Sequence, residues 1–569
     1  MTEAGNNYSE KKTQLHISVR NLVEFIFREG DIDNRSSRAM SADAMMEGTR
    51  IHRKIQGSMG KEYQAEVPLS LVVEGDLYEL TVEGRADGIF TEDGKCFVDE
   101  IKGMYRRVEL FEKPVFVHRA QAMCYAYIFA LQNNMETIGI QMTYCNLETE
   151  QTKYFREEFS FEEIKKWFDD LMEEYGKWAT FQCEMKNQRQ ASIKELNFPF
   201  EYRPGQKKLV SDVYRTIMRQ KLLFMQAPTG VGKTISTIFP AVKAVGEELA
   251  DRIFYLTAKT ITATVAKETF ALLEKNGYRA KTIQITAKEK LCPCDEMECN
   301  PVTCPYAKGH FDRVNDAVFD LLHRCEMIER DDILSQADRY TVCPFELCLD
   351  TASWCDNIIC DYNYVFDPNV YLKRFFQEGI KGDYIFLIDE AHNMVERSRQ
   401  MYSAQIYKED FLTVKRIMKE HSRSIEKALE KCNKILLGMK RECENYTVYD
   451  TFGNMVFSFM RLVTLLDEFL QKANEFPGKK DVMDFYFELR NFLNIYDLVD
   501  EHYVMYSELE ADGRFMLKLF CVDPSLNIQK RLDKGKSAVF FSATFLPVNY
   551  YKSLLSTKKD NYAIYADST

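Results

Sequence analysis

A glycine-rich segment near the middle of the chain constrains the fold more than any other feature. Residues 227–234, Ala-Pro-Thr-Gly-Val-Gly-Lys-Thr, follow the apolar run Leu222–Met225 and precede the helix-compatible stretch Ile235–Val245. The spacing fits the phosphate-loop pattern GxxxxGK[ST], with Ala in place of the first Gly. Strand, tight loop and helix in this order predict an α/β fold built on a parallel sheet.

The same segment predicts a nucleoside triphosphate site. The glycines let backbone N–H groups cradle phosphate oxygens, and the following helix adds its positive N-terminal end. Lys233 is placed to reach the β- and γ-phosphates, and Thr234 to ligate Mg²⁺. The expected nucleotide contacts are Ala227, Pro228, Thr229, Gly230, Val231, Gly232, Lys233 and Thr234.

Three further apolar runs end on polar motifs, as buried parallel strands do at the edge where ligands collect. Ile253–Leu256 leads into Thr-Ala-Lys-Thr, Tyr384–Ile388 into Asp-Glu-Ala-His, and Ala538–Phe541 into Ser-Ala-Thr. Asp389 is expected to hold Mg²⁺ through water, and Glu390 to polarise the attacking water.

A glutamine lies upstream of the phosphate loop, and the amide of Gln206 can pair with an adenine edge because it donates and accepts at once. These motifs in this order resemble a superfamily-2 helicase. The resemblance implies that Gln206 selects ATP. It also implies that residues 257–260 contact a nucleic-acid backbone, and that Ser542 and Thr544, with His392 of the Asp-Glu-Ala-His motif, couple hydrolysis to strand movement.

The cysteines identify the branch of this family. Nine of the 16 cysteines fall between Cys292 and Cys360, and such clustering in a reducing compartment favours a metal or cluster site over disulfides. The order Cys, Cys, Cys-Pro-Tyr, Cys-Pro-Phe, followed by Cys-Asp-Tyr-Asn-Tyr-Val-Phe at 360–366, resembles the iron–sulfur helicases of the XPD/DinG family.

That resemblance implies a [4Fe–4S] cluster on four thiolates. The expected ligands are Cys292, Cys299, Cys304 and Cys343, and Cys294 is a rival for one of these places. A Zn²⁺ site on four cysteines is chemically possible, although its usual paired CxxC knuckles are absent from the sequence. The family also implies a helical arch domain between the Asp-Glu-Ala-His and Ser-Ala-Thr motifs.

A second constellation lies near the N-terminus. Asp87 ends one strand-like segment, and Glu100 and Lys102 share a face of the next because side chains alternate along a strand. Adjacent antiparallel strands would bring Asp87 and Glu100 together as oxygen ligands for Mg²⁺ or Mn²⁺. Lys102 could then orient or activate a water for phosphodiester hydrolysis.

This pattern resembles the RecB/AddB branch of the PD-(D/E)xK nucleases. His52, on a predicted helix at 40–56, matches the upstream histidine of that branch, and Gln121 with Tyr125 matches its QxxxY helix, predicted here at 117–131. The resemblance implies that His52, Asp87 and Glu100 are metal ligands and that Lys102 is catalytic. Gln121 and Tyr125 would line the DNA-binding cleft.

The predicted fold class is α/β: a RecA-like parallel sheet carrying an inserted iron–sulfur domain and an inserted helical arch domain, preceded by an α/β PD-(D/E)xK nuclease-like domain. The length of 569 residues allows three or four domains. The predicted boundaries are 1–185 for the nuclease-like domain, 186–197 for a polar linker, 198–285 with 346–395 and 526–569 for the helicase lobe, 286–345 for the cluster domain and 396–525 for the arch.

Composition narrows the class of protein further. No signal-like segment and no run of about 18 apolar residues is present, so we expect a cytoplasmic protein that does not bind a membrane. The net charge of −12 does not indicate a nucleic-acid binder, but residues 186–222 carry nine Lys/Arg against three Asp/Glu. The expected partner is single-stranded or forked DNA.

The chain given ends at Thr569, soon after Ser-Ala-Thr, and no QxxGRxxR-like motif follows. We therefore expect a fragment that lacks the second RecA-like lobe and hydrolyses ATP slowly by itself. The leading interpretation is an ATP-dependent 5′→3′ DNA helicase joined to a nuclease. One alternative is a nuclease whose ATPase part only grips or gates DNA, and another is a non-catalytic iron–sulfur sensor of DNA damage or redox state.

Overall fold

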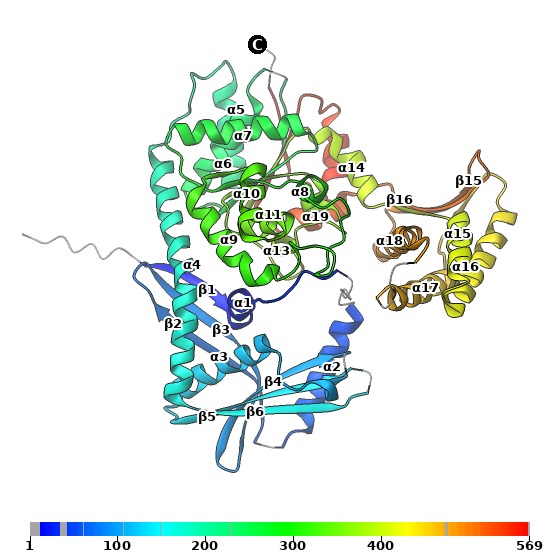
Figure 1. Ribbon diagram of the computed structural model, residues 1–569. Coiled ribbons are helices and arrows are strands. Elements are labelled where there is room, and N and C mark those ends of the chain that lie inside the picture. The colour runs from blue at the N-terminus through cyan, green and yellow to red at the C-terminus, as the bar shows by residue number, and fades with distance from the viewer. Residues whose placement is uncertain are drawn as a thin grey trace, which may run out of the picture. The chain divides into compact units, whose positions relative to one another are not determined.

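The computed structural model describes residues 12–34, 42–60, 62–105, 107–147, 149–228, 230–471, 473 and 476–566. The chain divides into two compact units, which are described separately (Figure 1). Unit 1 comprises Met1–Gln188, Glu296–Phe319 and Ala337–Cys343. Unit 2 comprises Arg189–Asp295, Asp320–Gln336 and Pro344–Thr569.

Unit 1 is built on a six-stranded mixed sheet in the order β1-β3-β4-β5-β6, with β2 also paired to β3. The strands β1 and β3 are parallel, as are β4 and β5, whereas β2–β3, β3–β4 and β5–β6 are antiparallel. The strands are β1 (Thr13–Ser18), β2 (Gln64–Glu74), β3 (Tyr78–Glu92), β4 (Lys95–Met104), β5 (Thr137–Asn146) and β6 (Thr152–Ser160).

Helices α1 (Val19–Ile26) and α3 (Phe116–Gln132) and the first part of α4 (Phe161–Glu195) share one apolar core with this sheet. Ten consecutive or near-consecutive residues of α3, from Ala120 to Ala130, are buried, as expected for a helix that is apolar on most of its faces. Helix α2 (Ala42–Ser58) contributes Ile51 and Ile55 to a smaller cluster with Ile101 of β4.

The helices predicted at 40–56 and 117–131 are confirmed within two residues at each end as α2 and α3. The residues on both sides of Gly84, 78–83 and 85–92, form one continuous strand, β3. Gly84, between them, does not interrupt the strand, because the absent side chain makes room for the Tyr125 ring: a Cβ there would lie 2.5 Å from the Tyr125 hydroxyl.

A short segment after α1, residues Arg28–Asn34, pairs within unit 1 with residues 299–315 of the cysteine-rich insertion; we call Arg28–Asn34 the strap. Ile32 N donates to Ala307 O at 2.9 Å, and Asn34 N donates to Cys299 O at 2.9 Å. Two carboxylates close the contact reciprocally: Asp31 accepts from Gly309 N at 2.6 Å, and Asp312 accepts from Gly30 N at 2.7 Å.

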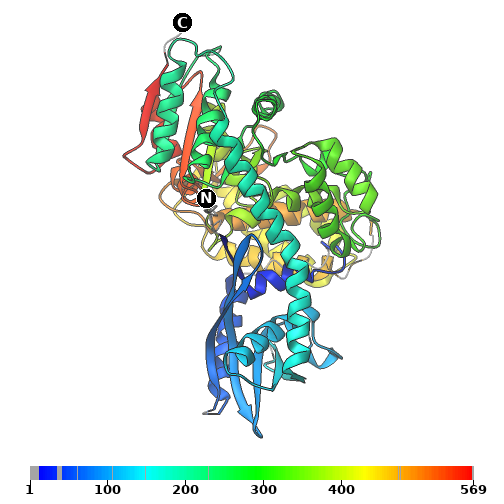
Figure 2. The same cartoon turned by 90° about the vertical axis from the view of Figure 1, so that its left-hand side faces the viewer.

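Unit 2 is built on an eight-stranded parallel sheet in the order β10-β9-β11-β8-β12-β17-β7-β18. Figure 2 shows the orange and red strands of the C-terminal part beside the green elements of this sheet. The strands are β7 (Leu222–Gln226), β8 (Arg252–Leu256), β9 (Thr282–Gln284), β10 (Met327–Ile328), β11 (Asn357–Cys360), β12 (Tyr384–Ile388), β17 (Ser537–Ser542) and β18 (Tyr562–Tyr565).

The central strands are buried on both faces, which explains why they read as continuous apolar runs. On one face, residues such as Met225 and Tyr255 pack in a core with α5 (Gln206–Met218), α6 (Lys233–Gly246) and α7 (Thr260–Lys275). On the other, Phe224 stacks on Phe540 with ring centroids 4.7 Å apart, and Phe254 meets Phe375 of α13 (Lys373–Phe376).

The remaining helices of the lobe are short connections or flank the sheet. They are α8 (Lys288–Leu291), α9 (His310–Arg324), α10 (Arg330–Tyr340), α11 (Pro344–Ala352), α12 (Asn363–Phe366), α14 (Met394–Met401), α19 (Ser525–Leu532) and α20 (Val548–Leu555). Helices α9 and α10 cross from one unit to the other along the chain. The four strands predicted for the lobe are confirmed, and the mixed α/β class with a parallel sheet is confirmed with them.

The region expected to be a helical arch, 396–525, also contains an antiparallel sheet in the order β13-β16-β15-β14. Its strands are β13 (Ala404–Tyr407), β14 (Tyr446–Tyr449), β15 (Tyr503–Leu509) and β16 (Phe515–Cys521), and its helices are α15 (Lys408–Met418), α16 (Arg423–Glu442), α17 (Asn454–Leu470) and α18 (Lys479–Tyr496). The helical stretches expected here are present, but the sheet was not predicted, because its strands are short and separated by long helices.

The polar stretch predicted as a linker is helical up to Glu195, where α4 ends. Its inward side chains anchor it in unit 2: Arg189 is 5% exposed and pairs with Asp356, and Ile193 is buried. The Lys243 ammonium donates to Ile193 O at 2.8 Å. Composition alone suggested a linker, but a few buried side chains keep the segment helical. Among the described residues, no helix has both the length and the apolar character needed to cross a membrane.

Candidate functional site

The phosphate loop connects β7 to α6 in unit 2. Gly230 and Gly232 have φ values of 90° and 73°, a left-handed conformation that favours glycine, and Gly232 caps α6 directly before Lys233. The Lys233 ammonium donates to Pro228 O at 3.2 Å, so it lies over the loop. Thr229, one of the predicted contacts, lies outside the described residues. The geometry is that of a helix N-terminus open to an anion.

Gln206, the first residue of α5, lies behind this loop. Its amide accepts from Arg203 N at 3.1 Å and donates to Val231 O at 3.2 Å. A Cβ added at Gly232 would lie 2.7 Å from the Gln206 amide nitrogen. Gln206 is buried, and these contacts tie it to the backbone of the loop. The structure therefore places Gln206 beside the nucleotide site, with its amide holding the phosphate loop.

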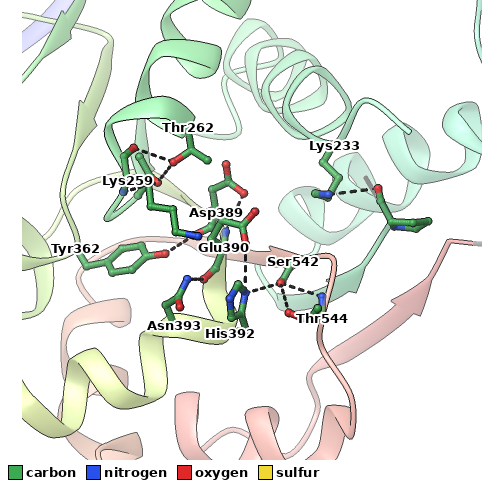
Figure 3. Close-up of polar contacts among 12 residues, drawn as sticks. Lys233, Lys259, Thr262, Tyr362, Asp389, Glu390, His392, Asn393, Ser542 and Thr544 are labelled. Atoms are coloured by element: carbon green, nitrogen blue, oxygen red, sulfur yellow. Dashed lines mark hydrogen bonds and ion pairs between the residues drawn. The ribbon is translucent and has the colours of Figure 1, made fainter. Parts of the chain in front are cut away.

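The acidic motif follows β12, at the same edge of the sheet. The Tyr255 hydroxyl donates to Asp389 Oδ2 at 2.6 Å. Glu390 N donates to Asp389 Oδ1 at 2.8 Å, and Figure 3 shows these two acidic residues side by side. Asp389 is 4% exposed, and burial raises the pKa of its carboxyl, opposed by these hydrogen bonds. Glu390 has a φ of 49°, a strained conformation for a residue with a side chain, of the kind found at functional sites.

A chain of polar contacts joins this motif to the end of β17. Glu390 Oε2 lies 3.3 Å from His392 Nδ1, and Ser542 Oγ lies 2.8 Å from the same nitrogen (Figure 3). Thr544 N donates to Ser542 Oγ at 3.1 Å. Burial lowers the pKa of His392, against the opposing effect of Glu390. The predicted residues Glu390, His392, Ser542 and Thr544 therefore form one connected network.

The segment after β8, residues 257–262, lies at the same edge of the parallel sheet. Thr257 shares a hydrogen bond with Thr262, and Thr262 Oγ1 donates to Lys259 O at 2.9 Å, so the loop before α7 is held in a compact turn (Figure 3). Backbone bonds align the neighbouring strand ends: Thr257 N donates to Cys360 O at 3.0 Å, and Asp389 N donates to Leu256 O at 2.9 Å.

Two tyrosines of the site were missed by the motif analysis. Tyr255 is fully buried, and its hydroxyl donates to the Asp389 carboxylate. Tyr362 donates its hydroxyl proton to the Asp389 carbonyl oxygen. Tyr362 lies in the Cys-Asp-Tyr-Asn-Tyr-Val-Phe segment, which offered a signal, whereas Tyr255 is indistinguishable in sequence from the other apolar-run residues of β8.

The second candidate site lies on β3 and β4 of unit 1. The register pairs Gly88 with Asp99, which makes Asp87 and Glu100 neighbours as predicted. His52 Nδ1 lies 3.5 Å from Asp87 Oδ1, and Ile101 N donates to Asp87 Oδ2 at 2.7 Å. Glu100 Oε1 lies 2.6 Å from the Lys102 ammonium, whereas the buried Glu100 Oε2 has no hydrogen-bond partner.

Helix α3 supplies the rest of this site. Lys102 Nζ donates to Gln121 Oε1 at 3.4 Å, and the buried Tyr125 ring packs against Gly84 of β3. Burial raises the pKa of Glu100 to about 7, although Lys102 opposes the shift. Burial lowers the pKa of His52, but the contact with Asp87 and the negative charges of Asp87 and Glu100 together outweigh burial, so the net shift of the pKa is upward.

One buried carboxylate of this site was missed. Asp99, next to Glu100, is fully buried and accepts hydrogen bonds from Thr143 Oγ1 at 2.6 Å and from the Tyr63 hydroxyl at 3.1 Å. Strand alternation points it to the face opposite Glu100, where it fixes β4 against β5. The sequence motif Asp-Glu-x-Lys contained it, but nothing in the pattern distinguished its role.

The predicted cluster cysteines fall in different parts of the chain. Cys292 ends α8 in unit 2, whereas Cys299, Cys304 and Cys343 belong to unit 1. Cys304 is buried, and Cys343 N donates to His310 Nδ1 at 3.1 Å. Cys348 and Cys355 are buried core residues, as predicted, but Cys325 is partly exposed. Within the part of the chain that the structure describes, no group of three or more His, Cys, Asp or Glu side chains has metal-ligand geometry.

Part of the chain is similar to known helicases. The DEAD_2 family model matches residues 272–411. The rat (Rattus norvegicus) protein "Regulator of telomere elongation helicase 1" is 20% identical over 248 residues, 35% of this chain and 19% of that protein. The Saccharomyces cerevisiae protein "General transcription and DNA repair factor IIH helicase subunit XPD/RAD3" is 23% identical over 232 residues, 35% of this chain and 29% of that protein.

Two solved structures are similar at low identity. "XPD_Helicase" aligns with a TM-score of 0.39 and 16% identity over 64% of this chain and 62% of that chain. "Truncated XPD" aligns with a TM-score of 0.40 and 15% identity over 64% of this chain and 100% of that chain. The chain spans less than a third of the length of the curated relatives it matches. The cysteine-rich insertion and the Asp-Glu-Ala-His motif both lie in the segment that is similar to a DEAD_2 domain.

Proposed function

We propose that this protein is an ATP-dependent DNA helicase of the XPD/DinG type that carries a divalent-metal-dependent DNA nuclease in its N-terminal part. It acts 5′→3′ on single-stranded or forked DNA and serves in DNA repair or processing. The observation that carries the motor proposal is the meeting of Lys233, Asp389, Glu390 and Ser542 at one edge of a parallel sheet. The DEAD_2 match to residues 272–411 supports it.

In the motor, the chain's own residues bind and position the triphosphate. Lys233 and the loop N–H groups hold the phosphates, and Gln206 keeps the loop in shape. Thr234 would ligate Mg²⁺ and Asp389 would hold it through water, and a hydroxyl with a carboxylate is a donor set that suits this cation. When bound, Mg²⁺ neutralises charge that develops on the phosphate oxygens. Glu390 orients the attacking water and accepts its proton.

The network from Glu390 through His392 to Ser542 connects hydrolysis to movement. A change in the charge of Glu390 alters its contact with His392, and His392 shares its ring nitrogen with Ser542 at the end of β17. Because Glu390 and Ser542 contact the same His392 nitrogen, a change in the charge of Glu390 would change the contact between His392 and the Ser-Ala-Thr loop. That loop is where helicases of this class respond to nucleotide.

The nuclease proposal rests on the oxygen ligands of unit 1. Glu100 Oε2 is buried with no hydrogen-bond partner, and a bound cation would satisfy it, so the residues present fit Mg²⁺ or Mn²⁺. His52, Asp87 and Glu100 would hold the ion, which supplies an activated water when bound. Lys102 orients the scissile phosphate or the water, and Gln121 with Tyr125 positions Lys102 and lines the DNA cleft.

Cys292, Cys299, Cys304 and Cys343 are proposed to hold a [4Fe–4S] cluster, with Cys294 as the rival ligand. Four thiolates match the donor set of such a cluster. The absorption spectrum and the iron content of anaerobically purified protein test this assignment. A colourless protein that contains zinc and no iron would replace the cluster with the four-cysteine zinc site.

The motor is tested with Lys233→Ala and the matched control Lys207→Ala, an exposed lysine of α5. The expected result is loss of ATP-dependent separation of a forked DNA duplex in Lys233→Ala only. Duplex separation that survives the loss of Lys233 would favour the alternative, a nuclease whose ATPase part only grips or gates DNA.

The nuclease is tested with Glu100→Gln, which keeps the side-chain shape, and with Glu112→Gln as an exposed control. Digestion of labelled single-stranded DNA with Mg²⁺ or Mn²⁺ should disappear in Glu100→Gln and persist in the control. Persistent digestion in Glu100→Gln would remove the nuclease assignment. If neither variant alters any DNA reaction while DNA affinity depends on the oxidation state of the cluster, the protein is the non-catalytic sensor.

A further inference from the structure

The histidine of the proposed nuclease site lies on a different element from the other ligands. His52 belongs to helix α2, whereas Asp87 and Glu100 belong to the paired strands β3 and β4. His52 Nδ1 and Asp87 Oδ1 are 3.5 Å apart, farther than the roughly 2.7–2.9 Å of a charge-assisted hydrogen bond. That contact does not by itself fix the helix, so α2 needs another attachment to β3.

Gln56 supplies such an attachment. It lies one helical turn after His52, on the same face of α2. Its amide nitrogen donates to Asp87 O at 2.9 Å and to Glu66 Oε1 at 3.0 Å. A backbone carbonyl and an ionised carboxylate only accept, so the side-chain amide must present its nitrogen here, and both of its protons are used. The amide therefore forms a bridge from α2 to the backbone of a proposed metal ligand.

The second acceptor of this bridge has an unusual backbone. Glu66 lies on β2 opposite Asp87, between two regularly paired residues on each strand. Its φ is 55°, in the left-handed region that residues with a side chain rarely adopt, and such conformations persist where the surrounding structure requires them. The Gln56 amide is therefore held between Asp87 and a residue whose backbone departs from the regular strand.

Other attachments of α2 are of a different kind. Ile51 and Ile55 pack in an apolar cluster with Ile101 of β4, and apolar contacts are not directional. Lys54 forms an ion pair with Glu150, and exposed pairs of this kind contribute little to the position of an element. The amide bridge is thus a directional contact that joins α2 to β3 beside the proposed metal site.

We infer that Gln56 is a positioning residue of the proposed metal site in unit 1: it ties α2 to the β3 backbone at Asp87 and thereby holds the His52 imidazole where it can ligate Mg²⁺ or Mn²⁺. The inference rests on the proposed nuclease function, because it assumes that His52, Asp87 and Glu100 share one cation. Gln56 does not ligate the ion. Its effect on the ion passes through His52.

The test is Mn²⁺ binding by the full chain without nucleotide, measured from the EPR signal of the free ion. The binding that disappears in Glu100→Gln is assigned to this site, which separates it from Mn²⁺ bound elsewhere on the chain. Gln56→Leu keeps the approximate size of the side chain and removes both hydrogen bonds. We expect it to lower the affinity of this site about tenfold, the usual effect of removing a group that orients a metal ligand. Lys54→Met, on the same helix, breaks the contact with Glu150 and should leave the affinity unchanged.

A variant without the imidazole shows whether Gln56 acts through His52. His52→Ala should lower the affinity by itself, and adding Gln56→Leu to it should lower the affinity no further. A further loss of about tenfold in the double variant would overturn the inference, because Gln56 would then act by another route. A loss in Lys54→Met as large as that in Gln56→Leu would also overturn it, because general anchoring of the helix would then be responsible.

The electron spin of bound Mn²⁺ gives a direct measurement of the contact with His52. A nitrogen ligand produces a ¹⁴N coupling in pulsed EPR spectra, which should be present in the original chain and absent from His52→Ala. Gln56→Leu should weaken or remove this coupling while Mn²⁺ stays bound through Asp87 and Glu100. If Gln56→Leu does not fold, Gln56→Asn serves the same test, because its amide is one methylene too short for the bridge.

Failure of the proposed function has a different signature from failure of this inference. If Glu100→Gln binds Mn²⁺ as tightly as the original chain, the proposed metal site itself is wrong, and the role of Gln56 falls with it. If the original chain binds Mn²⁺ at this site but Gln56→Leu changes neither the affinity nor the ¹⁴N coupling, only the role of Gln56 is refuted.

Discussion

At the scale of the residue, Gly232 shows how tightly the nucleotide site is specified. It combines a φ of 73° with a neighbour, the Gln206 amide, that a Cβ would meet at 2.7 Å. Any side chain at this position would therefore strain the left-handed backbone and would also clash with the Gln206 amide. The contact explains why the glutamine and the loop belong together even though 26 positions separate them in the sequence.

Gly232→Ala is expected to abolish most nucleotide binding, weakening the affinity for ADP by at least about tenfold, because relieving the clash displaces Gln206 and the loop. The control is Gly277→Ala, which has a φ of 103° and open space around its Cβ position. Both variants carry backbone strain, of roughly 1–2 kcal/mol, but only the first should lose affinity in a fluorescence titration. Equal affinities would contradict the contact with Gln206.

His118 of α3 gives a prediction about pH. Burial lowers its pKa to about 4, and the nearby Lys102 charge adds to the effect. The folded state therefore prefers the neutral ring, and its contribution to stability is complete above the unfolded pKa of about 6.5 and is lost as pH falls from there towards 4.

We expect His118→Gln to lose less stability than the original chain between pH 7 and pH 5, by roughly 2 kcal/mol. Urea denaturation followed by tryptophan fluorescence measures this difference, since two of the three tryptophans lie in unit 1, at 167 and 178. The same pH dependence in both proteins would show that His118 is not held neutral. His323, a histidine in the last turn of α9, provides a control substitution.

Sequence analysis could predict residues whose position follows from a tight turn or from the end of an apolar strand. Asp87 and Glu100 were predictable because a two-residue turn at Asp93-Gly94 sets the register of β3 and β4. Lys233 and Asp389 were predictable because short motifs mark the ends of apolar strands. Tyr255 was not, since its contact with the acidic motif is a hydrogen bond to a residue 134 positions away, and its sequence context is that of a core strand.

At the scale of the element, α4 shows where composition misleads. Residues 186–195 are mostly polar, and a linker was the natural prediction, yet the helix continues because Arg189 and Ile193 are buried in unit 2. The Arg189 guanidinium pairs with Asp356 and donates to Asp251 O at 3.0 Å. Composition does not reveal these buried side chains, because a long helix has few buried positions and many exposed ones.

Arg189→Met should destabilise unit 2 by about 3 kcal/mol, because it leaves the largely buried Asp356 carboxylate without its charge partner. The control is Lys194→Met, which changes an exposed lysine on the same helix and should alter stability by less than about 0.5 kcal/mol. Chemical denaturation of the two variants tests this. Similar stabilities would mean that the hydrogen bond from the Lys281 backbone N–H is enough to stabilise the Asp356 carboxylate without Arg189.

The antiparallel sheet of the arch region is a second feature that the sequence did not predict. β14 has only four residues, Tyr446–Tyr449, and its partner β15 begins at Tyr503. The intervening helices α17 and α18 dominate the periodicity, and the aromatic run at 485–506 contains both buried residues, such as Phe492, and exposed ones, such as Phe487. The parallel strands of the lobe were easier to predict because each is an uninterrupted apolar run that ends in a motif.

At the scale of the whole molecule, the cysteine-rich insertion is not confined to one unit. Its residues 296–319 and 337–343 fold with unit 1, where the strap binds them through Asp31 and Asp312. The predicted boundaries placed the whole of 286–345 in a domain of its own. Local sequence contains no signal for this contact, because the paired residues are 278 and 282 positions apart.

The double variant Asp31→Ala/Asp312→Ala should loosen the insertion while the sheet of unit 1 stays folded, because it removes the carboxylates that accept hydrogen bonds from Gly309 N and Gly30 N. Limited proteolysis followed by mass spectrometry should show faster cleavage within 299–312. Asp316→Ala, an exposed carboxylate on the same helix, is the control. An unchanged cleavage pattern in the double variant would show that the strap contributes nothing to the order of the insertion.

The strap also determines how this protein can be dissected. A truncated protein that begins at residue 198 would keep every motif of the proposed motor and all nine clustered cysteines. It would nevertheless lose Gly30, Asp31, Ile32 and Asn34, and with them the backbone partners of Cys299, Ala307 and Gly309. Residues 299–312 lie between the phosphate loop and the Asp-Glu-Ala-His motif in the sequence, but their hydrogen-bond partners lie at 30–34, so removal of the N-terminal part would leave these groups without those partners.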